Sequence, residues 1–130
     1  MDLQDLPNGP FVDHLGLRLT EVTGSKVVAE WTAGSKHHQP YGIVHGGVYA
    51  SVVESLGSIG SAVWFGDRGK VVGVSNTTDF YRAVSEGAMV STATPIHQGR
   101  SQQVWIVETL DAEGRLISRG QLRVQNLEGR

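Results

Sequence analysis

The stretch HGGVYASVVESLGSIGSAVWF, residues 45–65, decides the fold. Its apolar residues recur with a helical period. This stripe consists of Val48, Val52, Leu56, Ile59 and Val63, and Val53 and Trp64 widen it. Pro40 and Gly42 precede the stretch and Gly66 follows it, as helix boundary signals do. The sequence therefore predicts one helix over residues 45–65, about 30 Å long at about 1.5 Å per residue.

Patterns of alternating apolar and polar residues, which are typical of strands, flank this helix on both sides. The expected strands cover residues 15–20, 27–31, 71–82, 89–97, 102–110 and 116–124. The breaks between the later strands are short enough for antiparallel hairpins. Most of the 17 glycines in the chain fall between stretches of strand-like alternation. In the last strand Arg119, Gln121 and Arg123 share one face, which we expect to be solvated. The order predicts an α+β fold, one domain over residues 1–130 with its core at about 15–124, in which an antiparallel sheet covers one helix.

Composition excludes several classes of protein. The 130 residues suit one domain, and the absence of cysteine excludes disulfides, thiolate zinc sites and cysteine nucleophiles. A formal net charge of -2 with scattered basic residues argues against a nucleic-acid partner. Residues 1–10 lack the apolar region of a signal peptide, and no apolar stretch approaches the roughly 20 residues of a membrane span. We expect a cytoplasmic protein without a membrane partner.

A second face of the predicted helix carries small polar residues around one carboxylate. Its members are Gly47, Ser51, Glu54, Ser58 and Ser61. Glu54 is the only ionisable residue between His45 and Asp67, which indicates a largely buried helix that retains one acid. Two interpretations stay open. Glu54 is either a catalytic group or a structural carboxylate satisfied by serine hydroxyls or by a partner subunit.

The start of the helix offers hydrogen-bond donors. At His45-Gly46-Gly47 the backbone N–H groups are free of side chains and lie at the positive end of the helix dipole, which suits an anion or a developing oxyanion. Two glycines at a helix start are also a common way to turn a chain. Glu54 lies about 10 to 12 Å further along the axis, too far for one carbonyl to touch both. If both groups act on the same carbonyl, they come from different chains, which predicts a homodimer with sites at its interface.

Other chemistries fit the sequence poorly. His37, His38, His45 and Glu54 lack metal-ligand spacing, so we expect no metal. A Gly-x-Ser-x-Gly motif is absent, which argues against a serine hydrolase. We expect Trp31, Trp64 and Trp105 in the core.

The motifs QPYGIVHGG (residues 39–47) and ESLGS (residues 54–58) carry a resemblance to a known family. The chain resembles the hotdog-fold acyl-CoA thioesterases of the phenylacetate-degradation type. It is closest to the branch with the Arthrobacter-type 4-hydroxybenzoyl-CoA and the bacterial 1,4-dihydroxy-2-naphthoyl-CoA thioesterases. The resemblance covers residues 15–124. It implies a long central helix wrapped by a curved antiparallel sheet, dimers that share a continuous sheet, and often tetramers.

The resemblance also implies roles for individual residues. Glu54 would be the catalytic carboxylate, as general base for water or as nucleophile, and Ser58 would hold the water or the carboxylate. The Gly46 N–H and Gln39 would bind the thioester carbonyl, and His45 would position the helix start. Further substrate contacts would come from Gly47, Arg82, Gly99, Arg100 and Ser101, with the CoA nucleotide over Arg82 and the 99–101 turn. No cofactor is implied, because coenzyme A is part of the substrate.

The branch within the family affects the expected substrate. Ser58 favours the naphthoyl branch, which would place the protein in menaquinone biosynthesis, whereas Phe80 stands where some members of that branch carry histidine. We expect aryl-CoA substrates in preference to straight fatty acyl-CoA. The alternatives are a hotdog dehydratase of hydroxyacyl thioesters, which would use a histidine base, and a non-catalytic acyl-CoA-binding protein, which would not need Glu54.

Overall fold

The structure is a computed structural model that describes residues 9–129. The helices are α1 (Gly9–Leu15) and α2 (Gly46–Phe65), and the strands are β1 (Arg18–Val22), β2 (Val27–Ala33), β3 (Gly69–Phe80), β4 (Gly87–Gln98), β5 (Gln102–Asp111) and β6 (Leu116–Glu128). The predicted order of two strands, one long helix and four strands is confirmed.

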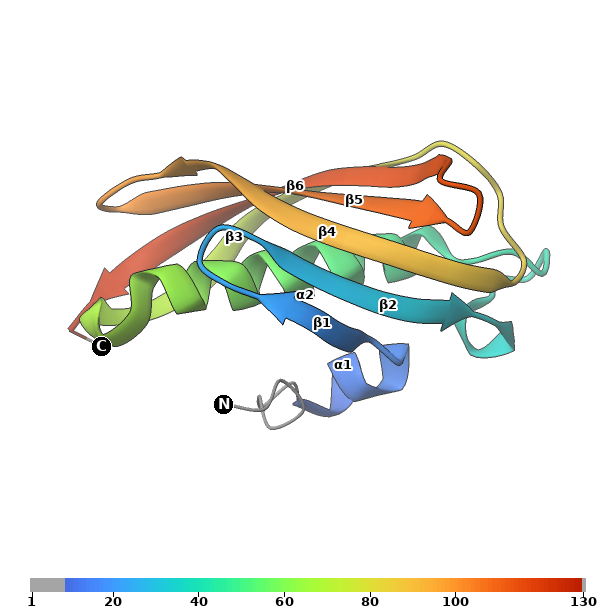
Figure 1. Cartoon of the computed structure of the whole chain (residues 1–130), viewed down its shortest axis with the longest axis horizontal. Coiled ribbons are helices and arrows are strands. Elements are labelled where there is room, and N and C mark those ends of the chain that lie inside the picture. Colours follow the sequence, from blue (N-terminus) through green and yellow to red (C-terminus); the bar gives the residue numbers. More distant parts are fainter. Residues whose placement is uncertain (1–8, 130) are drawn as a thin grey trace.

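All six strands form one antiparallel sheet in the order β1-β2-β4-β5-β6-β3. The sheet curves, and α2 runs along its concave face (Figure 1). Alternation in β6 follows the prediction, since Arg119, Gln121 and Arg123 are exposed while Leu122 and Val124 are fully buried. One face of the sheet is therefore solvated and the other covers the helix.

Capping residues fix the two ends of α2. The ring of His45, the N-cap residue, accepts a hydrogen bond from the N–H of Gly47. Gly66 ends the helix with a φ of 61°, a left-handed conformation that glycine adopts without strain. The predicted bounds of this helix are confirmed to within one residue.

The buried face of α2 is rotated from the predicted stripe. Val52 and Leu56 are fully buried, but Val63 is 45% exposed. The face that contacts the sheet consists of Tyr49, Val52, Val53, Leu56, Gly57 and Gly60. Apolar periodicity gave a shifted stripe because two of the sheet-facing positions are glycines, which add nothing to an apolar pattern.

The two glycines let helix and sheet approach closely. A side chain at Gly57 would collide with Leu122, and one at Gly60 would collide with the indole ring of Trp105. Trp105 is fully buried, as predicted, and Trp31 is 4% exposed. The glycines thus set the spacing between the helix and the sheet.

A buried polar network closes the end of the fold near the C-terminus of α2. The Trp105 N–H donates to the side-chain oxygen of Gln103 at 2.9 Å. The Gln103 amide donates to the carbonyl of Ser61 at 3.1 Å and to Asn126 at 2.9 Å. The Asn126 amide in turn donates to the carbonyls of Gly99 and Arg100. Every buried amide hydrogen-bonding group needs a partner, and this network supplies them while it ties the β4–β5 turn to the helix.

The chain before β2 departs from the prediction. Leu15 ends the short helix α1 and is not a strand residue, and β1 begins only at Arg18. His37, which is 2% exposed, explains the arrangement: its Nδ1 accepts from the Gly34 N–H, so its Nε2 donates to the carbonyl of Leu15 at 2.9 Å. This buried ring fastens the end of α1 to the loop after β2.

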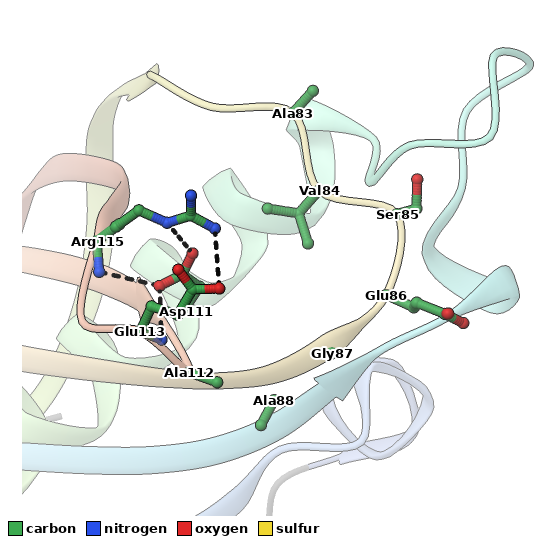
Figure 2. Close-up of a pocket in the computed structure, with 10 residues that line it drawn as sticks. All are labelled: Ala83, Val84, Ser85, Glu86, Gly87, Ala88, Asp111, Ala112, Glu113 and Arg115. Carbon is green, nitrogen blue, oxygen red and sulfur yellow. Dashed lines mark hydrogen bonds and ion pairs between the residues drawn. The ribbon is translucent and has the colours of Figure 1, made fainter.

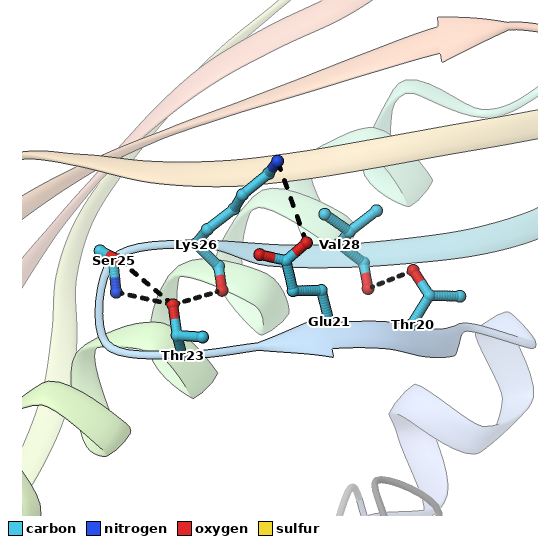
Figure 3. A network of polar contacts seen from close by, with 6 residues as sticks. All are labelled: Thr20, Glu21, Thr23, Ser25, Lys26 and Val28. Carbon is cyan, nitrogen blue, oxygen red and sulfur yellow. Dashed lines mark hydrogen bonds and ion pairs between the residues drawn. The ribbon is translucent and has the colours of Figure 1, made fainter.

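The first hairpin has the expected turn. The N–H of Thr23 donates to the carbonyl of Lys26 at 2.8 Å. The Thr23 hydroxyl donates to the same carbonyl at 3.2 Å and accepts from the Ser25 N–H at 3.1 Å (Figure 3). Lys26 also lies 3.9 Å from the carboxylate of Glu21 across the hairpin. Local hydrogen bonds thus hold the β1–β2 turn, which residues 23–25 predicted.

The edge strand β3 stays open in the single chain. Within residues 9–129 it pairs with β6 alone, and Val72 and Val74 are 47% and 48% exposed. Natural edge strands are usually short, charged or covered, because an open edge invites pairing with another chain. β3 has 12 residues and carries only Lys70 and Asp79 as charges.

The segment Gly46–Arg68 is long and apolar enough to cross a membrane by length and composition alone. The expectation that no stretch approaches such a span was therefore wrong on this criterion. The core helix of a globular fold passes the same test, and α2 contacts all six strands of the sheet.

We predict that Gly60→Ala destabilises the protein. The added methyl group would overpack against the buried Trp105 ring, and this cost exceeds the roughly 1 kcal/mol that alanine gains over glycine in a helix. The expected net loss is about 1 to 2 kcal/mol in the free energy of unfolding, measured by urea denaturation. The control is Gly34→Ala, where nothing lies within 4 Å, so stability should stay within about 0.5 kcal/mol of wild type. A Gly60→Ala protein as stable as wild type would contradict the packing described here.

Candidate active site

A pocket of about 280 Å³ opens at the start of α2. Its walls come from the loop before the helix, the first turn of the helix and the end of β3. The lining residues are Gln39, Ile43, Val44, Gly46, Tyr49, Phe80, Tyr81, Arg82 and Ala83. Three of the residues predicted from sequence, Gln39, Gly46 and Arg82, thus lie around one cavity.

The backbone at the helix start offers one free donor to this pocket. The Gly47 N–H is taken by the ring of His45 at 2.8 Å, and the Val48 N–H by the His45 carbonyl at 2.9 Å. Within residues 9–129 the Gly46 N–H has no acceptor. The expectation that Gly47 also presents its N–H to substrate was wrong, because the capping histidine occupies it. Gly46 itself has no room for a side chain, since the Phe80 ring lies against it.

Gln39 is held so that its amide N–H₂ remains available. The side-chain oxygen of Gln39 accepts a hydrogen bond from the Tyr41 N–H, and its backbone bonds to Ile43 and Gly42 close the loop. In the described part of the chain, the Gln39 amide nitrogen donates to no other group. A substrate carbonyl in the pocket could therefore accept from Gln39 and from Gly46 together.

The rings of the three histidines in the loop between β2 and α2, His37, His38 and His45, bond to backbone groups. His37 bonds to Leu15 and Gly34 as described above, and the Nε2 of His38 donates to the carbonyl of Ser85 at 2.6 Å. No group of three or more His, Asp or Glu side chains suited to a metal ion occurs among residues 9–129. These rings shape the loop that carries Gln39.

Glu54 lies two turns further along α2, beside β3. Gly73 faces it, and a side chain at position 73 would collide with its carboxylate. The Asn76 amide donates to the carbonyl of Ala50 at 2.9 Å and approaches the Glu54 carboxylate at 3.5 Å. Glu54 is exposed in the single chain, so the expected burial of this acid was wrong for one chain alone. The open edge of β3 explains the exposure.

The serine hydroxyls around Glu54 do not satisfy its carboxylate. Ser51, Ser55 and Ser61 donate to helix carbonyls one turn back, at 2.7, 2.7 and 3.0 Å. Ser58 is partly buried, and its hydroxyl bonds to no side chain in the described part of the chain. Ser61, predicted on the polar face, is fully buried. The interpretation of Glu54 as a structural carboxylate satisfied by serine hydroxyls is therefore not supported by these hydrogen bonds.

One chain does not bring the two halves of the predicted site together. Glu54 does not line the pocket that holds Gly46, and eight residues of helix, about 12 Å, separate them. The same holds for the predicted nucleotide contacts. Arg82 follows β3 at the start of α2, whereas Gly99, Arg100 and Ser101 form the β4–β5 turn at the other end of the sheet (Figure 1). A 12-residue strand such as β4 separates those ends by about 40 Å at full extension.

Sequence reasoning missed the role of two residues here. Tyr49 lines the pocket beside Phe80, a position that the family resemblance had already related to the substrate, and Asn76 approaches Glu54. Tyr49 stands three residues after Gly46, so the i, i+3 spacing was a signal that both share a helix face. Asn76 follows a bulge between Gly73 and Ser75, which a strict alternation pattern cannot reveal.

A second pocket, of about 300 Å³, lies between loop 83–87 and the β5–β6 hairpin (Figure 2). Its one cation pairs with two of its three carboxylates: Arg115 bonds to Asp111 at 2.8 Å and lies 3.6 Å from Glu113. The backbone N–H of Arg115 donates to Asp111 and lowers the pKa of that carboxyl below its usual value. The network tightens a hairpin and contains none of the predicted site residues.

Comparison with known proteins identifies the family. Residues 41–118 match the model of the Thioesterase superfamily. Proofreading thioesterase EntH of Cronobacter turicensis (strain DSM 18703 / CCUG 55852 / LMG 23827 / z3032) is 35% identical over 107 residues, which cover 82% of this chain and 78% of EntH.

Solved structures agree. The crystal structure of S. sahachiroi AziG is 50% identical, with a TM-score of 0.91 over 93% of this chain and 98% of AziG. Thioesterase HI1161 from Haemophilus influenzae is 28% identical, with a TM-score of 0.90 over 98% of this chain and 89% of that one. This chain belongs to the thioesterase superfamily and has its hotdog fold.

Proposed function

We propose that this protein is a cytoplasmic acyl-CoA thioesterase that hydrolyses aryl-CoA thioesters, such as 1,4-dihydroxy-2-naphthoyl-CoA or a hydroxybenzoyl-CoA, to the free acid and CoA. Membership of the thioesterase superfamily supports the reaction class. The observation that carries the proposal is the free N–H of Gly46 beside the available Gln39 amide, in a pocket at the positive end of α2. Such donors stabilise the oxyanion that forms when a thioester carbonyl is attacked.

The chemistry requires an activated oxygen opposite these donors. As a general base, Glu54 takes a proton from water, and the water oxygen attacks the carbonyl carbon. The tetrahedral oxyanion then collapses, the C–S bond breaks, and the proton passes from Glu54 to the departing thiolate. As a nucleophile, Glu54 would instead attack the carbonyl carbon itself. The C–S bond would then break, the CoA thiolate would leave and take a proton from solvent, and water would hydrolyse the resulting anhydride to the free acid and the Glu54 carboxylate. Both routes need a carboxylate close to the carbonyl held by Gly46.

Two copies of the chain meet this need. We infer a homodimer in which the open edges of β3 pair antiparallel about a two-fold axis, and tetramers would combine two such dimers. In a pair centred near Thr77, Phe80 of one copy stands opposite residue 74 of the other. Phe80 marks the Gly46 pocket, and Gly73 and Asn76 flank Glu54. Pairing of this kind would bring Gly46 of one copy toward Glu54 of the other.

The same symmetry would unite the proposed nucleotide contacts. Asn126 holds the 99–101 turn next to the start of β3, since the Asn126 N–H donates to the Ser101 carbonyl and Asn126 pairs with Val71. Antiparallel pairing sets the start of one β3 against the end of the other, where Arg82 lies. The CoA nucleotide would then contact Arg82 of one copy and the Arg100 turn of the other.

An aromatic wall supports a planar acyl group. Tyr49, Phe80 and Tyr81 line the pocket, and the rings of Tyr49 and Phe80 lie 6.0 Å apart between centroids. Aromatic rings pack well against one another at such distances. A flat aryl group therefore suits this pocket better than a flexible alkyl chain does.

We predict that Glu54→Gln lowers the turnover of a benzoyl-CoA or naphthoyl-CoA substrate by at least about 10²-fold, because removal of a general base or nucleophile commonly costs that much. Release of CoA is measured with a thiol reagent. The matched control is Glu108→Gln, the same change at an exposed ion pair with Arg119 on the outer face of the sheet, which should keep wild-type turnover. Full activity of Glu54→Gln would refute the assignment of Glu54.

Gly73→Ala tests the contact between β3 and the carboxylate. The added methyl group would occupy space that Glu54 now fills, so the carboxylate must move. We expect kcat to fall at least about tenfold with little change in KM, since small displacements of a reacting group are costly while the carbonyl pocket is untouched. Gly34→Ala is the control. Equal kcat values for Gly73→Ala and wild type would show that the position of Glu54 does not matter.

Subunit mixing tests the shared site. Glu54→Ala and Gly46→Pro each disable one half. Proline at the first helical position removes the N–H without breaking the helix, and its ring also displaces Phe80, which lies against Gly46 in the same half of the site. Random exchange between equal amounts makes half of the dimers mixed, each with one intact site, so about a quarter of wild-type activity should return. Activity is assayed after denaturation and refolding together. If mixing restores nothing while each refolded variant is dimeric, both groups act within one chain.

A further inference from the structure

Two buried hydroxyl groups lack a hydrogen-bond partner in the described part of the chain: those of Tyr49 and Ser118. Tyr49 is 2% exposed and Ser118 is 1% exposed. Buried polar atoms in proteins are almost always hydrogen-bonded, so each exception calls for an explanation. Both residues neighbour Phe80, which lines the candidate active-site pocket.

Tyr49 belongs to the wall of the candidate active-site pocket. It stands one helical turn after Gly46, about 5 Å along the axis, and on the same face of α2. A group bound to the Gly46 N–H would therefore extend along the Tyr49 ring. Phe80 flanks that ring on one side and also lies against Gly46.

Ser118 lies beside Phe80 at the end of a row of hydroxyls. The row crosses the inner face of the sheet, where Ser91 pairs with Thr109, Thr109 with Ser118, and Ser118 with Phe80. The earlier members are satisfied, since the Trp31 N–H donates to Ser91 at 3.0 Å and the hydroxyls of Ser91 and Thr109 are 2.7 Å apart. Ser118 is the member nearest the pocket and the one without a partner.

The Tyr49 hydroxyl is suited to donate. Burial raises the pKa of Tyr49 to about 12, so the phenol keeps its proton at any ordinary working pH. A phenol can also accept, as a serine hydroxyl can. Both groups can therefore bond to a neutral or anionic oxygen.

We propose that the Tyr49 hydroxyl, with that of Ser118 behind Phe80, binds an oxygen substituent on the aromatic ring of the acyl group. Tyr49 is then the residue that selects oxygenated over unsubstituted aryl thioesters. This inference rests on the proposed function. It assigns Tyr49 to the side of the acyl ring that lies away from the carbonyl bound at Gly46.

The physical reason for selection is the cost of a buried unpaired group. A site built to bond a substrate oxygen disfavours the analogue that lacks it, because the protein hydroxyl then stays unpaired in the complex. An apolar pocket distinguishes the same two substrates far less.

The test compares Tyr49→Phe with wild type on benzoyl-CoA and on 2-, 3- and 4-hydroxybenzoyl-CoA. For the hydroxylated isomer that wild type prefers, we expect kcat/KM to fall about tenfold or more, and for benzoyl-CoA we expect no loss. Ser118→Ala should act in the same direction. Tyr41→Phe is the control, because the Tyr41 side chain is 89% exposed and only its backbone N–H, which the substitution keeps, bonds to Gln39; kcat/KM should change for neither substrate.

Stability separates a ligand role from a structural one. Tyr49→Phe removes a hydroxyl that has no partner within residues 9–129, so Tm should stay the same or rise. A clear fall in Tm would mean that the hydroxyl bonds within the assembled protein, for example to a partner subunit, and would overturn the proposal. Equal loss on benzoyl-CoA and on its hydroxylated forms would also overturn it, as would no loss on either.

Direct binding keeps this test independent of catalysis. Quenching of tryptophan fluorescence reports ligands near Trp31, which contacts Tyr49. Wild type should bind the preferred hydroxybenzoate more tightly than benzoate, and Tyr49→Phe should bind both equally. If wild type releases no CoA from any thioester, the proposed function fails. In that case a binding difference present in wild type and lost in Tyr49→Phe supports the role of Tyr49, and equal binding in both proteins overturns it.

Discussion

The close contact between α2 and the concave face of the sheet is the constraint on which the rest of the structure depends. It occurs where side chains are absent: Gly57 against Leu122, Gly60 against Trp105, and Gly120 of β6 against Val53. Larger residues would lift the helix off the sheet and open cavities that a core of this size tolerates poorly. The same approach brings the Ser61 carbonyl within reach of the Gln103 amide, so the polar network and the apolar core depend on one spacing.

Because α2 is held so closely, it fixes two reactive features at once. Its first turn presents the Gly46 N–H to the pocket, and its third turn presents Glu54 beside β3. The separation between them is a property of the helix and cannot be closed by a loop movement. A second copy is the simplest way to bring such groups together, and the long open edge of β3 offers the surface for it. The separation of these two groups along α2 thus favours a dimer of this chain.

Much of the fold could be predicted from the sequence because its signals are local. The capping residues His45 and Gly66 mark the helix, and period-two alternation marks the later strands. The failures have long-range causes. The buried face of α2 depends on glycines that contact β5 and β6, and Leu15 lies in a helix because His37, 22 residues away, binds its carbonyl. Among the candidate site residues, Gly46 and Gln39 were predicted together, whereas the occupied N–H of Gly47 depends on a ring orientation that a sequence does not specify.

The two ends of the molecule differ in how their polar groups are used. At one end, both side-chain amides of the network, those of Gln103 and Asn126, are hydrogen-bonded. Toward the other end, the buried hydroxyls of Tyr49 and Ser118 have no hydrogen-bond partner among residues 9–129. Tyr49 and Ser61 are twelve residues apart on α2, about 18 Å, a distance at which substitutions act independently. During evolution, substitutions around Tyr49 and Ser118 can therefore change the ligand while the network of Gln103 and Asn126 preserves the fold. A family with this arrangement can diversify in specificity without a loss of stability.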